Sequence, residues 1–166
     1  MLSPKVEEAL NNQLQVELQS AYVYLGMAAH CENVSLEGFA KWLHRQAEEE
    51  YEHAMKFYNY INDRDGRVEL QALDAPPTKY SAPLQVFETA LSHERSVTEK
   101  IDDLYELVNN ERDFASQAWL DWFVTEQVEE EKTVGLIVDQ LKLIGDRGDG
   151  LFILDKELGS RSETPR

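Results

Sequence analysis

The sequence predicts an all-α protein: a four-helix bundle of up-down, long crossover, down-up topology with a short fifth helix at its C-terminal end. Apolar residues recur at alternating spacings of three and four over four long stretches, which is typical of helices that share a core. Turn residues separate these stretches, and one long segment rich in helix breakers divides them into two pairs. With 166 residues, 42% of them apolar, the chain suits one domain, expected over residues 1–160.

The first two helices are predicted over residues 4–33 and 36–63. Ser3 can cap the first helix, and Pro4 is tolerated at its first position, where the backbone N–H would have no partner in the helix. The second helix is expected to start after Ser35. Because the connection between the two helices is short, they are expected to run antiparallel.

An extended crossover is predicted over residues 64–81, before a third helix over about 82–108. Asp65-Gly66 and Pro76-Pro77 stop helix formation at the two ends of the crossover. The third helix is expected to end where Asn109-Asn110 favours a turn. The crossover therefore separates two tightly connected helix pairs.

The fourth helix is predicted over about 112–144 and the fifth over 150–159. Gly145 ends the fourth helix, and the apolar stretch after Gly150 is long enough only for a short one. Residues 161–166 are polar and are expected to form a disordered tail.

Each of the four predicted core stripes is interrupted near its middle by ionisable or amide side chains. The two halves of the chain repeat this arrangement at an offset of 77 residues, and the polar side chains lie at one height when counted from the turn in each pair. They are therefore expected to converge in the middle of the bundle. The offset relates Glu17 to Glu94, Glu50 to Gln127, and His53 to Glu130.

These converging side chains have the composition of a site for two metal ions. Four carboxylates in a dry core repel one another, and their pKa values rise unless a cation neutralises them. Two divalent ions balance four carboxylates, and oxygen-rich ligation with one imidazole suits iron or manganese better than copper or structural zinc. Glu50 and His53, in Glu-x-x-His spacing, share one helical face, as di-iron helical bundles require.

Two ligand sets are expected, and they share one bridging carboxylate. Gln127 replaces the carboxylate related to Glu50 and is expected to form a hydrogen bond beside the ligands. The second ion has no imidazole and should bind more loosely, which suits a site that releases its product. The first ion is assigned to Glu17, Glu50 and His53, and the second to Glu50, Glu94 and Glu130.

Ordinary structural roles are the alternative for each of these residues taken singly. A buried ion-pair network would need Arg or Lys in the stripes, and none of the stripes contains one. Tyr24 can hydrogen-bond a ligand, donate an electron or simply pack in the core, and Trp122 has the same alternatives. Glu49, Glu126 and Glu129 flank the stripes and form either a third metal site or a solvated acidic face.

The charge and the single cysteine restrict the classes of partner. A net charge of −16 disfavours nucleic acids and anionic membranes, since both are negatively charged. The start of the chain has no basic and apolar signal, and no apolar run is long enough to span a membrane, so a cytoplasmic protein is expected. Cys31 is alone and cannot form an internal disulfide.

The chain resembles the bacterial and archaeal non-haem ferritins over residues 1 to about 160, so its bundle is identified as ferritin-like. The resemblance implies roles for Tyr24 and Trp122 beside the site, and a third iron site at Glu49, Glu126 and Glu129. The motifs that carry the resemblance, in the places of the family's ferroxidase ligands, are Glu17, the run EEEYEH with Glu50 and His53, Glu94 after His93, and the run EQVEEE with Gln127 and Glu130.

The same resemblance implies the assembly and excludes one cofactor. The subunits are expected to form a homo-oligomeric hollow cage of 24, with the crossover paired across a two-fold contact and the fifth helix near a four-fold axis. Bacterioferritins are similar but carry a second Glu-x-x-His and a haem-ligating methionine. Gln127, Glu130 and Tyr51 occupy those positions here, so no haem is expected.

The function implied by the resemblance is iron storage and detoxification by a ferroxidase. Fe(II) binds between the helices, O2 or peroxide oxidises it to Fe(III), and the product joins a ferric oxyhydroxide mineral inside the cage. Two alternatives stay open: a passive iron-storage cage without significant ferroxidase activity, and an oxidase that retains its di-iron centre.

Overall fold

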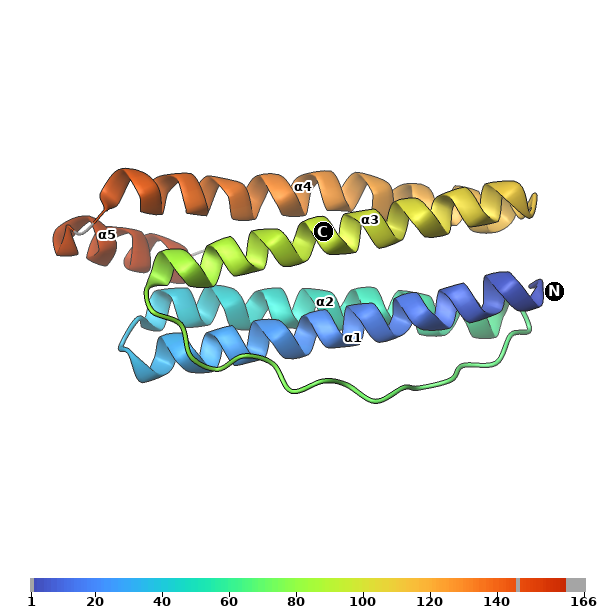
Figure 1. The fold of residues 1–166 in the computed structure, drawn as a ribbon, viewed down its shortest axis with the longest axis horizontal. Helices are drawn as coiled ribbons and strands as arrows, with labels where there is room; N and C mark the ends of the chain where they lie inside the picture. Colours follow the sequence, from blue (N-terminus) through green and yellow to red (C-terminus); the bar gives the residue numbers. More distant parts are fainter. Residues whose placement is uncertain (1, 146, 161–166) are drawn as a thin grey trace.

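The structure is a computed structural model, and it describes residues 2–145 and 147–160. Within these residues it contains five α-helices and no strand, so the predicted fold class is confirmed. Figure 1 shows the four long helices side by side, paired as α1 with α2 and α3 with α4. The tail predicted at 161–166 lies outside the described residues. The helices are α1 Pro4–Asn33, α2 Glu37–Asp63, α3 Pro83–Asn110, α4 Phe114–Ile144 and α5 Gly148–Gly159.

The observed helix ends differ from the predicted ones by one or two residues, because local backbone geometry decides them. The helix α4, predicted to start at about residue 112, starts at Phe114: Arg112 has a positive φ of 57°, and Asp113 caps the helix by accepting a hydrogen bond from Ser116 N. The third helix continues through the asparagines that were expected to end it, and Glu111 N still donates to Leu107 O at 2.9 Å. The remaining differences are the starts of α2 at residue 37, α3 at residue 83 and α5 at residue 148.

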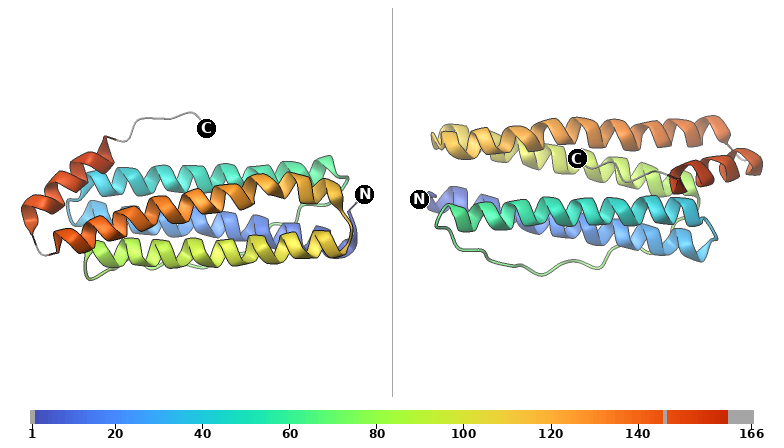
Figure 2. Two further views of the ribbon diagram at one scale, coloured as in Figure 1. Left: turned by 90° about the horizontal axis from the view of Figure 1, so that it is seen from above. Right: turned by 180° about the vertical axis from the view of Figure 1, so that it is seen from behind.

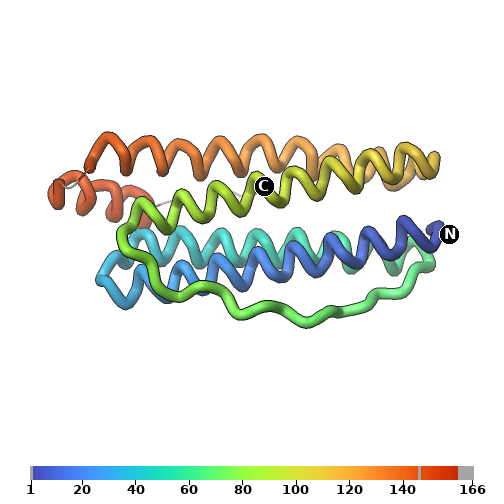
Figure 3. The backbone as a smooth tube through the Cα atoms, in the orientation of Figure 1, coloured from blue at the N-terminus to red at the C-terminus, as the bar shows by residue number. Residues whose placement is uncertain are grey.

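The crossover runs in extended form along α1, from one end of the bundle to the other (Figures 1 and 3). Amide side chains of α1 hold its backbone. Asn11 Nδ2 donates to a crossover carbonyl at 2.9 Å, and Asn11 Oδ1 accepts from Glu69 N at 2.7 Å. Gln19 makes the same pair of bonds with Asp74, at 3.0 and 2.7 Å. Because each amide both donates and accepts, the crossover has a fixed register on α1.

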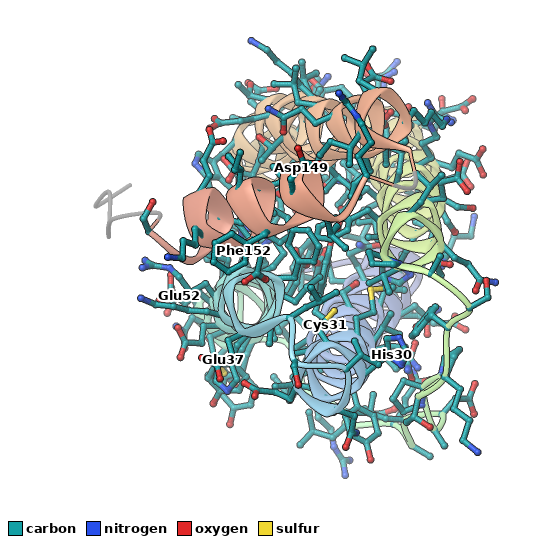
Figure 4. The ribbon with its side chains drawn as sticks, turned by 90° about the vertical axis from the view of Figure 1, so that its left-hand side faces the viewer. His30, Cys31, Glu37, Glu52, Asp149 and Phe152 are labelled. Carbon is teal, nitrogen blue, oxygen red and sulfur yellow. The ribbon has the colours of Figure 1, made fainter. Side chains whose placement is uncertain are left out.

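The short helix α5 crosses the end of the bundle at which α2 begins, as Figure 2 shows from two sides and Figure 4 along the bundle. Asp155 Oδ1 accepts a hydrogen bond of 2.9 Å from Phe39 N in the first turn of α2, which has no side-chain cap of its own. Gly38 makes this approach possible, since a Cβ there would lie 1.7 Å from the Asp155 carbonyl oxygen. The contact fixes α5 against α2.

The core of the bundle consists of two apolar clusters with a polar layer between them. One cluster lies toward α5 and includes Phe39 and Phe87, and the other lies toward the opposite end and includes Leu10 and Phe57. Neither cluster contains the buried acids, which lie between the two. Among the described residues, no helix is both long and apolar enough to cross a lipid bilayer.

Candidate metal centre

A layer of buried polar side chains crosses the middle of the bundle, and each of the four long helices contributes to it. The residues are those at which the core stripes are interrupted in the sequence. A carboxylate is rarely buried to this degree unless it is paired or binds a metal. The exposed fractions are 1% for Glu17, Glu94 and Glu130, 2% for Glu50, and 5% for His53 and Gln127.

Three of these side chains form a compact group between α1 and α2. Glu17, Glu50 and His53 each place one ligand atom within 4.8 Å of the others. Glu50 Oε2 lies 3.7 Å from His53 Nδ1, one helical turn away on α2. This group has the same members as the set expected for the first ion, and its spacing is compatible with one cation among two carboxylates and an imidazole.

A second group lies between α2 and α4, and its membership differs from the set expected for the second ion. His53, Glu126 and Glu130 place one ligand atom each within 4.8 Å of one another. His53 therefore belongs to both groups. Glu126, expected only at a third site, is 7% exposed and lies in this layer. Its position one turn before Glu130 on α4 is the signal that could have placed it here.

Glu94 lies in the same layer but belongs to neither group, and other side chains hold its carboxylate. Tyr24 donates a hydrogen bond from its hydroxyl to Glu94 Oε1. Gln127 Nε2 lies 3.4 Å from Glu94 Oε2 and 3.3 Å from the Glu94 carbonyl oxygen. Burial and the charge on Glu94 raise the pKa of Tyr24 well above its usual value, so the phenol stays protonated and donates.

Two further amides contact the carboxylates, and sequence reasoning did not assign either to the site. Gln13 Nε2 donates to Glu17 Oε1 at 2.7 Å. Gln46 Nε2 donates to Glu130 Oε2 at 2.7 Å and to Glu50 Oε1 at 3.3 Å. Each glutamine lies four residues before a glutamate of the centre on the same helix, which places the two side chains on one face. This spacing could have indicated both.

Burial raises the pKa values of three carboxyl groups in the layer. Loss of solvation is the largest cause for Glu17, Glu50 and Glu94. The charge of Glu17 raises the pKa of Glu50 further, and the charge of Glu50 does the same for Glu94. Without a cation, these carboxyl groups therefore keep their protons to higher pH than free glutamate, and a divalent ion competes with those protons for the same oxygens.

The rim of the centre contains the remaining residues singled out in the sequence. Trp122 is 38% exposed, and its ring meets the His53 ring edge to face at a centroid distance of 5.2 Å. Lys56 Nζ lies 3.8 Å from the centroid of the same Trp122 ring. Glu49 is half-buried and Glu129 is exposed. Among the described residues, these two glutamates are not part of either compact group.

Comparisons with known proteins agree in fold and family. The Ferritin family, described as a ferritin-like domain, matches residues 7–144. The chain is 42% identical over 162 residues to the bacterial non-heme ferritin of Staphylococcus aureus (strain USA300), covering 98% of each chain. It is 41% identical to the same protein of Staphylococcus haemolyticus, again over 98% of each chain.

Solved structures of archaeal ferritin have the same fold. An engineered closed form of the Archaeoglobus fulgidus ferritin superposes with a TM-score of 0.97 at 44% identity, covering 99% of this chain and 100% of that one. The open-pore ferritin of the same archaeon superposes with a TM-score of 0.96, also at 44% identity, covering 98% of this chain and 100% of that one.

Proposed function

The chain belongs to the ferritin family, and on this premise we propose that it stores iron after oxidising Fe(II) at the buried centre between its four long helices. The observation that carries the proposal is the layer of buried carboxylates around one imidazole, in which three acids have raised pKa values. An acid cluster of this kind is unfavourable by itself and becomes favourable when cations bind.

Two Fe(II) ions are the substrates of the centre. The first takes Glu17, Glu50 and His53, which already lie within 4.8 Å of one another. The second takes Glu50, Glu94 and Glu130, with Gln127 as a hydrogen-bonding neighbour. These three carboxylates are not one of the compact groups, and Glu94 accepts a hydrogen bond from Tyr24 that this ion would have to rearrange. The second ion is therefore the more loosely held.

Glu126 adds a carboxylate beside His53 and Glu130, and this carboxylate offers Fe(III) a path away from the position of the second ion. Glu126 groups with these two residues, and this arrangement supports a transfer position for Fe(III) at the α4 side of the centre. We propose that Glu126, Glu49 and Glu129 together form the third iron site. Glu49 is half-buried and Glu129 is exposed.

The oxidation is balanced by the pair of ions and one oxidant. Each Fe(II) loses one electron, and O2 or peroxide accepts the two electrons. Carboxylates favour Fe(III) over Fe(II) because the higher charge is attracted more strongly in a site of low dielectric. Tyr24, which donates to Glu94, holds that ligand in place and is a phenol in contact with the centre that can supply a further electron.

The ferric product is stored inside a homo-oligomeric cage, for which we propose 24 subunits in the cytoplasm. Large apolar side chains on the surface of α4 and α5 support contacts with other copies of the chain. Those that are more than half exposed are Leu143 at 80%, Val128 at 70%, Phe114 at 68%, Ile153 at 64%, Phe152 at 59% and Leu136 at 55%. The phenyl ring of Phe152 lies on the end of the bundle shown in Figure 4.

Iron loading in air tests storage against a retained di-iron oxidase. When the purified assembly receives a large excess of Fe(II), we expect iron to co-elute with the protein far above two ions per subunit. This much ferric product can stay with the protein only if a cage encloses it. The measurement is iron and protein content across a size-exclusion profile. A ratio that stays at two irons per subunit, however much Fe(II) is added, would favour the retained centre and contradict storage.

A further inference from the structure

Gln46 is a buried amide at the junction of the two ligand sets. It lies on α2, one turn before Glu50, and none of its surface is exposed. Its Nε2 donates to Glu130 on α4 at 2.7 Å and to Glu50 on its own helix at 3.3 Å. One amide group therefore connects two carboxylates from different helices. The shorter bond goes to Glu130, the ligand that serves only the second ion.

The carbonyl oxygen of the same side chain has no hydrogen-bond partner. Among the described residues, Gln46 Oε1 is a buried acceptor left unpaired, although buried amide oxygens are normally satisfied. The Gln13 amide contacts one carboxylate, that of Glu17. Gln13 Oε1 is not among the buried, unpaired side-chain atoms of the described residues. An unpaired acceptor at a metal-binding layer indicates a donor that arrives with the ligand, such as a water molecule of a hydrated cation.

We propose that Gln46 is a positioning residue for the second iron: its amide N–H group orients Glu130 and Glu50, and its Oε1 accepts a hydrogen bond from a water that the incoming ion carries. The proposal rests on the proposed ferroxidase function. Hydrogen bonds to ligating carboxylates fix their orientation and affect metal affinity even though the donor does not touch the metal. Gln46 is placed to do this for two ligands at once.

The test replaces Gln46 by methionine, which keeps the length and volume of the side chain and removes both hydrogen-bonding groups. Co(II) alone is the probe, because its visible absorption reports the ligands of each ion as it binds. The assembled Gln46→Met protein is expected to bind the second Co(II) about 10-fold more weakly than the parent, with a changed absorption spectrum for that ion. The first binding step should weaken less, because Gln46 contacts only one ligand of that ion, Glu50, and through the longer bond of 3.3 Å.

Gln13→Met is the matched control, because Gln13 contacts a carboxylate assigned only to the first ion. It is expected to weaken the first binding step by about 10-fold and to leave the second unchanged. If Gln46→Met binds both ions with the affinities and spectra of the parent, or weakens both steps equally, the proposal is wrong. A parent protein that binds no Co(II) in its interior would instead overturn the proposed function.

A crystal structure of the parent assembly soaked with Co(II) tests the same proposal without any substitution. The expected result is Gln46 Nε2 within hydrogen-bond distance of Glu130, with Gln46 Oε1 accepting from a water on the second ion. Direct coordination of Co(II) by Oε1, or an amide turned away from both glutamates, would overturn the positioning role. This measurement decides the question even if the methionine variant fails to fold.

Discussion

Glu50→Ala is expected to remove rapid Fe(II) oxidation. Glu50 is the only carboxylate assigned to both ions, and it is 2% exposed, so no solvent-facing group can take its place. Loss of outer-shell partners typically costs 10- to 100-fold, so loss of the shared ligand should lower the initial rate by at least about 100-fold. The measurement is O2 consumption after addition of Fe(II) at about two ions per subunit.

The matched control for this variant is Glu52→Ala, which removes an exposed acid from the same helix. Its oxidation rate should equal that of the parent, since the residue does not contact the centre. A passive storage cage predicts another pattern, in which acids of the interior nucleate mineral and Glu50 has no special part. In that case Glu50→Ala would consume O2 as fast as the parent.

Binding of divalent ions is expected to stabilise the protein strongly, and by more at higher pH. An ion at about 100 times its Kd adds about 2.7 kcal/mol to the free energy of unfolding, and two ions add about twice that. At about 2–4 °C per kcal/mol, the thermal midpoint should rise by roughly 10–20 °C. The measurement is calorimetry of the Zn(II)-loaded and metal-free protein at several pH values.

The pH dependence follows from the raised pKa values of Glu17, Glu50 and Glu94. In the metal-free protein these groups hold protons more tightly than in the unfolded chain. Their contribution to stability is therefore complete below the ordinary glutamate value of 4.5 and is lost as the pH rises through their folded pKa values. Zn(II) must displace these protons, so its affinity rises over the same range.

The difference in thermal midpoint between loaded and metal-free protein should therefore widen as the pH rises from about 4.5. Glu50→Gln is the control, because it keeps the shape of the side chain without an ionisable group. Its difference should be smaller than that of the parent and should widen less with pH, because only Glu17 and Glu94 still have to release protons. A parent protein whose midpoint does not respond to Zn(II) would show that the buried acids do not bind cations.

The sequence predicts the bundle because the spacing of apolar residues shows which face of each helix is buried in the core. Glu17, Glu50, Glu94 and Glu130 were singled out by their place in apolar stripes, and all four are buried. The helix ends were less predictable, since a positive φ at a non-glycine residue such as Arg112 depends on its surroundings. The docking of α5 at Gly38 depends on a tertiary contact that has no periodic signal.

The detailed contacts of the centre could not be predicted, because they depend on side-chain conformations across helices. Spacing alone predicts that Glu50 and His53 lie on the same face of their helix. It cannot show that Gln46 reaches Glu130 on another helix. Spacing did give Glu126 the same face of α4 as Glu130, but it could not show that Glu126 would approach His53 on another helix. The structure places it with His53 and Glu130.

The location of iron in the assembled protein tests the central claim most directly. Crystals soaked anaerobically with Fe(II) and measured by anomalous scattering at the iron edge would count the ions and place them. The account predicts two iron peaks in the polar layer of each subunit, one beside Glu17, Glu50 and His53 and a weaker one beside Glu130. Iron found only on the outer surface, with the interior acids in contact with one another alone, would contradict it.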